Sequence, residues 1–234
     1  MKILAIDTST SIFSLCLKIN NHDEIIEYEA GVTHSKIILQ EIKSILKKCD
    51  LVISDLDTIA FSSGPGSFTG IRIASGVAYG LAFPYKIPIV PVSSLEVIAS
   101  MAGSKYIMST IDARMDQIYL QIFRTKANKK NFSPLTKPQV LGPSELPKLP
   151  QEIQNNLTII GTGYELYKEQ FNDAYHKINF LAVNVQRGLS AYVANLADCN
   201  IPKEFSLKEI FPQYVRNRVA YTIEERKLNE NYRK

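Results

Sequence analysis

The chain has 234 residues, of which 45% are hydrophobic and 21% charged, and its formal net charge is +4. This composition excludes wholesale disorder and suits one large domain or two small lobes with a buried core. The weakly basic charge permits an acidic partner such as nucleic acid without requiring one.

Sparse cysteines and short apolar runs indicate where the protein works. The three cysteines lie far apart and form no CxxC pair: Cys16, Cys49 and Cys199. That pattern predicts reduced thiols rather than disulfides or a zinc site. The N-terminal apolar run is interrupted by Asp7, and the longest apolar tract, 76–92, contains Pro84, Lys86 and Pro88. We therefore expect a cytoplasmic protein with neither a signal peptide nor a membrane span.

Taken in chain order, the first elements form a predicted hairpin that opens at an aspartate. Residues 2–6 form an apolar run that ends at Asp7, and residues 13–19 then alternate apolar and polar side chains. The pattern recurs where the run 106–111 ends at Asp112 and a second alternating stretch follows. Two hairpins with the aspartate in register predict a duplicated α/β lobe.

Helices and further strands are predicted between and after the hairpins. Segment 34–49 repeats apolar residues at helical spacing: Ile38, Ile42, Ile45, Leu46 and Cys49. Strands are expected at 57–62 and 157–160, and Ser93 or Ser94 is a candidate N-cap for a helix that contains Glu96.

The most distinctive segment is the glycine-rich loop GPGSFTG, residues 64–70. Such loops often bind phosphate through backbone amides at a helix N-terminus. This one lacks the lysine of the Walker A motif, and its GxGxxxG spacing differs from the GxGxxG dinucleotide pattern. Anion binding by its amides stays open as an alternative.

The helix expected after this loop carries two apolar stripes. Small residues recur every four positions: Gly70, Ala74, Ala78 and Ala82. Large residues recur beside them: Ile73, Val77 and Leu81. We expect the large stripe to pack on a sheet, which leaves the small stripe for close approach by a second helix. The alternative is that the small stripe packs internally.

Six motifs occur in one order along nearly the whole chain: ILAIDTST, HS at 34–35, GPGSFTGIRI, VSSLE, IDAR and PQYVR. In this order they resemble the TsaB (YeaZ) family. The resemblance implies an α/β protein with two related lobes of the actin, Hsp70 and sugar-kinase (ASKHA) type. The implied limits are an N-terminal dimerisation lobe, 1–104, a C-terminal lobe, 105–215, and a tail, 216–234.

The resemblance also implies a function. The family takes part in making N6-threonylcarbamoyladenosine at position 37 of tRNAs that read codons beginning with A. Its members are non-catalytic subunits that pair with TsaD, the transferase, and the ATPase TsaE then joins the pair. Contact with tRNA through the complex, and a homodimer of the isolated chain, are further expectations.

A comparison with TsaD-type transferases favours the non-catalytic role. Those proteins carry His-x-x-x-His where this chain has Ser94 and Ile98. Isoleucine offers no metal ligand, so we expect no metal and no cofactor, and a metal-dependent transferase or protease is disfavoured.

The candidate site residues form two groups. The expected partner or dimer interface consists of Ile38, Glu41, Ile42, Ile45, Gly70, Arg72, Ala74, Ala78 and Ala82. A vestigial nucleotide or phosphate site, with weak nucleotide binding, would use Asp7, Thr8, Ser9, Gly64, Gly66, Ser67 and Asp112. The rival to a scaffold is an independent ATP-binding kinase or ATPase of the same fold. The alternative is a purely structural role, in which both aspartates only hydrogen-bond within the hairpin turns and Arg114 is the ion-pair partner of Asp112.

Overall fold

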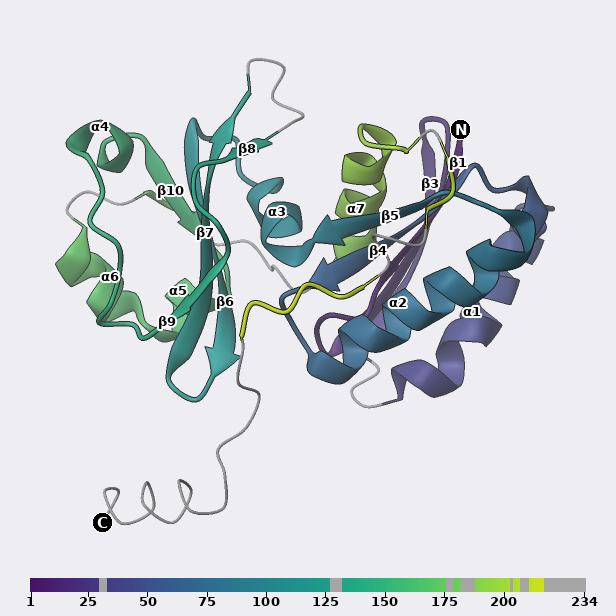
Figure 1. The fold of residues 1–234 in the computed structure, drawn as a ribbon, viewed down its shortest axis with the longest axis horizontal. Coiled ribbons are helices and arrows are strands. Elements are labelled where there is room, and N and C mark those ends of the chain that lie inside the picture. Colours follow the sequence, from purple (N-terminus) through teal and green to yellow (C-terminus); the bar gives the residue numbers. More distant parts are fainter. Residues whose placement is uncertain are drawn as a thin grey trace, which may run out of the picture.

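The chain folds into two β-sheets with helices between them and on their outer sides (Figure 1). The computed structural model describes residues 1–29, 33–126, 132–175, 179–181, 188–202, 204–206 and 211–216. The predicted tail, 216–234, lies outside the described residues except for Arg216. The two-lobed α/β fold class is confirmed.

The first sheet has the strand order β3-β2-β1-β4-β5. Its strands are β1 (Lys2–Asp7), β2 (Ile12–Ile19), β3 (His22–Glu29), β4 (Thr58–Gly64) and β5 (Ile89–Ser93). β1 and β2 form the predicted antiparallel hairpin, and β1, β4 and β5 run parallel. β4 is buried along its whole length because helices cover both faces of the sheet.

The second sheet has the order β11-β10-β6-β7-β8, and β9 pairs with β7. Its strands are β6 (Tyr106–Arg114), β7 (Gln117–Thr125), β8 (Phe132–Pro134), β9 (Gln139–Leu141), β10 (Leu157–Ile160) and β11 (Asn179–Phe180). β6 and β7 form the second predicted hairpin, and β10 runs parallel to β6 as β4 does to β1. The topology of the first sheet is thus repeated in the second.

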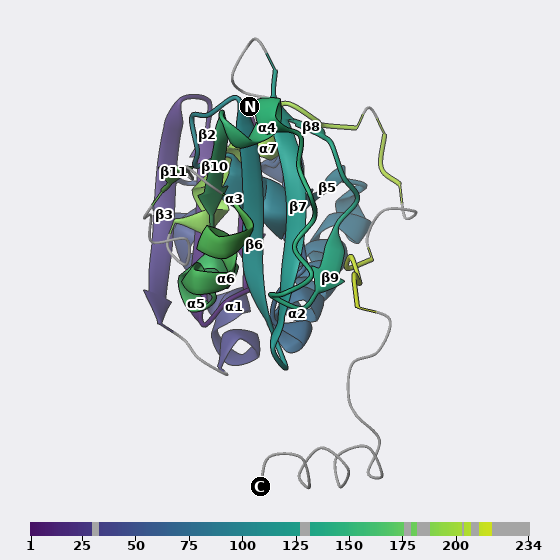
Figure 2. The ribbon, with the colours of Figure 1, turned by 90° about the vertical axis from the view of Figure 1, so that its left-hand side faces the viewer.

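Helices form three layers around the sheets. The helices are α1 (His34–Lys48), α2 (Phe68–Ala82), α3 (Ser94–Ala99), α4 (Gln151–Gln154), α5 (Thr162–Leu166), α6 (Lys168–Ala174) and α7 (Leu189–Asp198). α1 and α2 cover the outer face of the first sheet, and α3 and α7 lie between the sheets (Figure 1). α5 and α6 pack outside the second sheet, on the side nearest the viewer in Figure 2. In the described ranges, two short 3-10 helices, Ile53–Asp55 and Phe83–Tyr85, accompany these helices.

The core between the sheets joins the two lobes. It combines strand residues of the first sheet with α3, with α7 and with the inner face of the second sheet. Val193 and Ala194 of α7 are fully buried there, and Ser190 on the same helix bonds Ser14 of β2 through their hydroxyls at 2.7 Å. Apolar burial of this kind stabilises by about 25 cal/mol per Å².

α7 packs against the first sheet from a late position in the chain. It packs on β1, β2 and β4 although the sequence assigns 105–215 to the second lobe. After the second sheet, the chain thus returns to cover the inner face of the first sheet. Residues 182–187, which lead into α7, lie outside the described residues.

Among the described residues, no helix combines the length and the apolar character needed to cross a bilayer.

Candidate functional site

The glycine loop is held against the loop that follows β1. A Cβ added at Gly70 would lie 1.7 Å from the carbonyl oxygen of Thr8, and one at Gly66 would lie 2.8 Å from that of Ser9. The Thr8 hydroxyl donates to the Gly70 carbonyl at 2.7 Å, and the Ser67 amide donates to the Ser9 carbonyl at 2.8 Å. Glycine is needed here because two backbones meet, and no phosphate is required to explain it.

The Ser67 side chain also begins α2. Its hydroxyl accepts from the Gly70 amide at 3.3 Å, which is the N-cap contact expected of serine. Ser93 stands at the N-cap of α3 as predicted, but it makes no side-chain cap bond. The hydroxyls of both Ser93 and Ser94 are buried without a partner within the described part of the chain.

Asp7 is buried at the end of β1, with 1% of its surface exposed. Its carboxylate accepts from the Ser9 amide at 3.0 Å, from the Ser9 hydroxyl at 3.0 Å and from the Ser62 hydroxyl. Burial raises the pKa of this carboxyl, while the bonds from Ser62 and Ser9 act in the opposite direction. The carboxylate oxygens of Asp7 thus accept hydrogen bonds from its own loop and from β4.

A cleft of about 880 Å³ opens between the two lobes. Of the predicted nucleotide-site residues, five line it: Asp7, Ser9, Gly66, Ser67 and Asp112. The other two do not. The Thr8 hydroxyl is used by Gly70, and Gly64 faces Ile71 and Gln213. Most of the predicted residues therefore lie together at the cleft. The backbone amides of Ser9 and Ser67, however, donate to other groups of the same loops.

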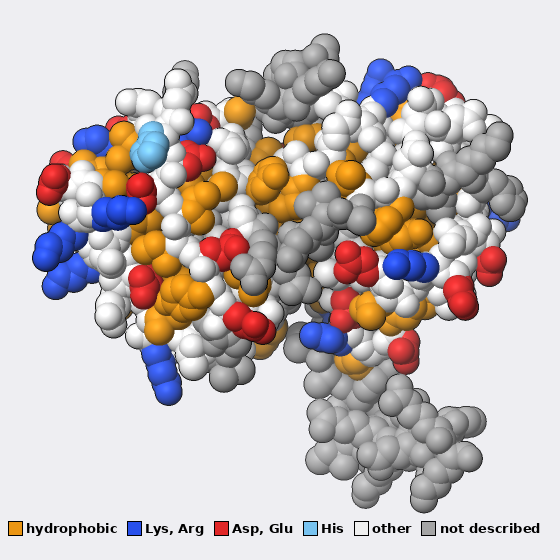
Figure 3. Space-filling view, turned by 180° about the vertical axis from the view of Figure 1, so that it is seen from behind, with side chains coloured by type: hydrophobic (Ala, Val, Ile, Leu, Met, Phe, Trp, Pro, Cys, Tyr) orange, Lys and Arg blue, Asp and Glu red, His pale blue; other side chains and the backbone are white. Residues whose placement is uncertain are grey.

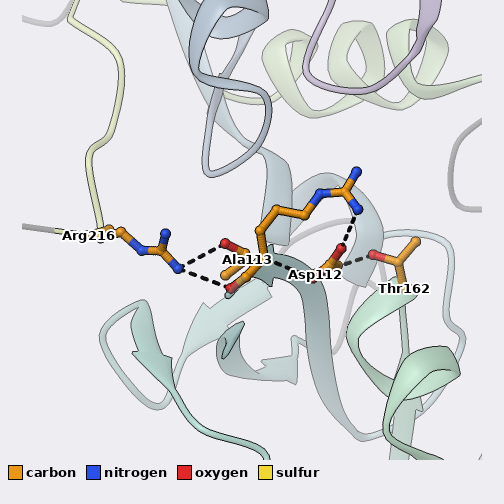
Figure 4. Close-up of polar contacts among 5 residues, drawn as sticks. Asp112, Ala113, Thr162 and Arg216 are labelled. Carbon is orange, nitrogen blue, oxygen red and sulfur yellow. Dashed lines mark hydrogen bonds and ion pairs between the residues drawn. The ribbon is translucent and has the colours of Figure 1, made fainter. Parts of the chain in front are cut away.

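The second hairpin places Asp112 at the far wall of this cleft (Figure 4). The Asp112 amide donates to the Thr162 hydroxyl at 3.0 Å, and the Asp112 carboxylate accepts from the Arg114 amide at 2.8 Å. The Arg114 guanidinium pairs with the same carboxylate at 3.1 Å. These contacts match the turn and ion pair that the sequence left open. Because the Arg114 side chain is largely exposed, the pair stabilises little.

Two residues of α3 that the sequence analysis singled out, Ser94 and Ile98, also line the cleft. Ser94 and Ile98, both of α3, are buried with 4% exposure each. Within the described ranges, no group of three or more His, Cys, Asp or Glu side chains could hold a metal ion. His34 lies elsewhere, at the start of α1, where its Nε2 is 3.2 Å from the Thr10 carbonyl and burial lowers its pKa.

The face of α2 that meets the sheet is the opposite of the one expected. The small stripe is fully buried against the first sheet at Ala74, Ala78 and Ala82, and Gly70 is buried beside Thr8. The large stripe of Ile73, Val77 and Leu81 is only partly buried. The prediction that the small stripe is left free is wrong, because the large side chains of β1 and β4 fill the space and leave room only for alanine on the helix.

The predicted contacts on α1 need the same correction. Ile38, Ile42 and Ile45 are at most 2% exposed and pack in the core under the helix. Glu41 is half-buried and accepts from the Tyr28 hydroxyl at 3.1 Å. The outer face of α1 instead presents Leu39, which is 60% exposed.

The exposed face of α2 is marked by two glycines. A Cβ added at Gly76 or Gly80 would meet nothing within 4 Å, so neither glycine is explained by a contact in the described chain. Arg72, the one exposed member of the predicted α2 interface, extends the same face toward the N-terminus of the helix. Its guanidinium lies over the ring of Phe68 at 3.5 Å and donates to the Tyr214 hydroxyl at 2.8 Å. We define the outer face of α2 as Arg72, Ile73, Gly76, Val77 and Gly80.

The repeated sheet topology and the cleft between the lobes define a two-lobed α/β protein of the actin-like type. A family model described as "TsaD: tRNA N6-adenosine threonylcarbamoyltransferase" matches residues 18–234. The chain is 31% identical over 233 residues to the tRNA threonylcarbamoyladenosine biosynthesis protein TsaB of Haemophilus influenzae, a match that covers 94% of this chain and 96% of the relative. TsaB of Escherichia coli is 32% identical over 177 residues, which are 72% of this chain and 74% of the relative.

Solved structures agree with this placement. A structure titled YeaZ from Pseudomonas aeruginosa superposes with a TM-score of 0.75 at 26% identity, covering 91% of this chain and 99% of that one. A second, described as an uncharacterised protein with similarity to peptidase YeaZ from the same organism, gives a TM-score of 0.76 at 27% identity, over 92% and 99%. The chain belongs to the TsaB (YeaZ) family, whose named members are tRNA threonylcarbamoyladenosine biosynthesis proteins.

Proposed function

We propose that the chain is a non-catalytic docking subunit for N6-threonylcarbamoyladenosine formation at position 37 of tRNAs that read codons beginning with A. In this role it binds TsaD, the transferase, and activates it by fixing its conformation. The observation that carries this proposal is the outer face of α2, where Gly76 and Gly80 face open space. A glycine inside a helix destabilises the fold by about 0.5–1 kcal/mol relative to alanine. Because no contact within the described chain explains Gly76 or Gly80, we infer that a partner contacts this face.

Helix docking is the contact that such a face suits best. Small residues let two helix backbones approach closely, and the partly buried Ile73 and Val77 beside them supply apolar area. The exposed Leu39 of α1 continues this area on the neighbouring helix. The match to the TsaD family model supports a partner of related fold.

The contents of the cleft support a role without catalysis. Ser94 and Ile98 offer no metal ligand set, and the amides of Ser9 and Ser67 already donate within the loops. The Asp7 carboxylate already accepts hydrogen bonds from the Ser9 amide and from the hydroxyls of Ser9 and Ser62. These points favour a chain with no cofactor of its own over the rival ATPase, and they leave weak nucleotide binding as the lesser proposal.

Further partners follow from the same role. TsaE joins the TsaD pair, and tRNA is reached through the complex rather than by a basic surface of this chain alone. On the face seen in Figure 3, Lys and Arg side chains are interspersed with Asp and Glu, and this arrangement does not form a single-sign patch. In isolation the chain would pair with a second copy through the outer face of α2, and the assembly would stay in the cytoplasm.

The test of this proposal places an arginine in the outer face of α2. Gly80→Arg should leave the fold intact, because the new side chain points into open space, and should weaken co-purification with TsaD at least tenfold. The matched control is Gly103→Arg, since Gly103 also faces open space but lies in the turn after α3. Equal TsaD recovery by wild type, Gly80→Arg and Gly103→Arg would move the interface to another surface.

A further inference from the structure

The last described segment, Phe211–Arg216, crosses from one lobe to the other. In Figure 1 it is the yellow stretch that runs from beside α2 to the foot of β6. At its start, the Gln213 amide donates to the Ser63 carbonyl of β4 at 2.7 Å. Three residues later, the Arg216 side chain lies in the second lobe against the β6–β7 turn. A segment of four residues, Gln213–Arg216, is thus bonded to both lobes.

Further contacts to the first lobe lie at the start of α2. Tyr214 accepts a hydrogen bond from the Arg72 Nε at 2.8 Å, and its ring lies 6.1 Å from the ring of Phe68. The Arg72 guanidinium lies over both rings, at 3.5 Å from the centroid of Phe68 and 5.4 Å from that of Tyr214. Such stacking on aromatic faces is attractive even for a partly exposed cation.

Within the described residues, the hydrogen bonds from this segment to the second lobe come from the Arg216 guanidinium, including the bond to Ala113 that Figure 4 shows. An Arg216 Nη donates to the Ala113 carbonyl at 2.8 Å, to the Arg114 carbonyl at 3.3 Å and to the Gln117 side-chain oxygen at 2.6 Å. The other Nη lies 3.2 Å from the Met115 sulfur. Charge-assisted bonds of this kind are stronger than neutral ones, and the planar fork sets their direction.

The β6–β7 turn, to which Arg216 is hydrogen-bonded, has unusual backbone φ angles. Arg114, Met115 and Asp116 have φ angles of 61°, 57° and 53°, so three successive residues other than glycine take the left-handed conformation. That conformation disfavours side chains with a Cβ and persists where neighbouring contacts impose it. The bonds from Arg216 to the carbonyls of residues 113 and 114 supply such contacts at the entry of the turn.

The same segment lies along the cleft. Gln213, Tyr214, Val215 and Arg216 all line it, together with α2, α3 and the β6–β7 turn. In a two-lobed fold the separation of the lobes is free to change unless something bridges them. We propose that Gln213–Arg216 is an interlobe strap, which fixes the opening of the cleft through bonds within the chain rather than through a ligand bound between the lobes.

The strap is tested by measuring the distance between the lobes in the full-length protein. Spin labels are placed at Lys43→Cys on α1 and Glu169→Cys on α6, which are both exposed positions. Cys49 and Cys199 are replaced by serine, and Cys16 is kept because it is fully buried. Dilution with excess unlabelled chain removes distances between two copies, and pulsed electron spin resonance gives the distance distribution.

Arg216→Ala should lengthen and broaden this distribution relative to wild type, and Arg216→Lys should give an intermediate result, because an ammonium keeps the charge but cannot reach all three acceptors. The control is Arg124→Ala. Arg124 is an exposed arginine on β7 of the second sheet, and its replacement should leave the distance distribution unchanged. Circular dichroism establishes that each variant is folded.

Gln117→Ala removes an acceptor from the other side of the bridge and serves as the second variant if Arg216→Ala does not fold. It should broaden the distribution in the same direction. The proposal would be overturned if Gln117→Ala kept the wild-type distance distribution and Arg216→Ala either did the same or failed to fold. A broadening of equal size in Arg124→Ala would do the same.

Discussion

Replacing Ala78 by arginine is expected to unfold the protein. Ala78 is fully buried in the core between α2 and the first sheet, in the same apolar cluster as Phe61 and Leu4. An arginine there overfills a packed core and buries an unpaired charge, and these two mechanisms belong to the most destabilising known. The expected loss in the free energy of unfolding is more than about 4 kcal/mol, which approaches the whole stability of a typical domain.

Denaturant unfolding followed by circular dichroism measures this loss. The matched control is Gly80→Arg on the same helix, which introduces the same side chain on the opposite face and should unfold within about 1 kcal/mol of wild type. If Ala78→Arg were as stable as wild type while Gly80→Arg unfolded, the face of α2 that meets the sheet would have to be reassigned.

Gly70→Ala is expected to cost about 3 kcal/mol or more. The added Cβ would lie 1.7 Å from the Thr8 carbonyl oxygen, and that oxygen belongs to backbone held between β1 and the Asp7 contacts. Neither backbone can move away without breaking the bond from the Thr8 hydroxyl to the Gly70 carbonyl. The start of α2 would therefore separate from the loop after β1.

The control for Gly70→Ala is the same substitution six residues further along the helix. At Gly76 an added Cβ meets nothing, so Gly76→Ala should raise the free energy of unfolding by about 0.5–1 kcal/mol through helix propensity alone. Chemical denaturation of both variants compares the two sites directly. Similar stabilities for the two variants would contradict the close backbone contact at Gly70.

The sequence predicts most elements of the two hairpins and the long helices. β1 and β6 are apolar runs, β2 and β7 alternate, and α1 repeats its apolar residues at helical spacing, so each carries a periodic signal. β3 and α7 are not predicted. β3, with the sequence HDEIIEYE, is an acidic edge strand that gains its conformation by pairing with β2, and α7 is placed by packing between the sheets.

The candidate site is only partly predictable for a different reason. Both stripes of α2 are apolar, so periodicity locates a helix without telling which stripe meets the sheet. That choice depends on the shapes of Leu4, Ile59 and Phe61 across the interface, which leave room for alanine but not for leucine. The motif spacing argues against a known phosphate loop but does not predict the contact between Gly70 and Thr8, because that contact joins residues 62 positions apart and has no local signal.

The strap has a similar origin. Its residues belong to the PQYVR motif, which helped to identify the family but carries no local chemistry that points to Arg72 or Gln117. Only the fold brings residue 216 beside the β6–β7 turn. A search of the sequence for catalytic groups would overlook it, because Arg216 acts on backbone carbonyls of its own chain.

The docking role is tested most directly by reconstituted tRNA modification. TsaD and TsaE of the same organism are incubated with unmodified tRNA, ATP and an activated threonylcarbamoyl donor, and N6-threonylcarbamoyladenosine is quantified with and without this chain. We expect modification with the wild-type chain, loss of at least tenfold without it or with Gly80→Arg, and none with the chain in the absence of TsaD. Modification by this chain without TsaD, or equal modification by TsaD without this chain, would contradict a non-catalytic docking subunit.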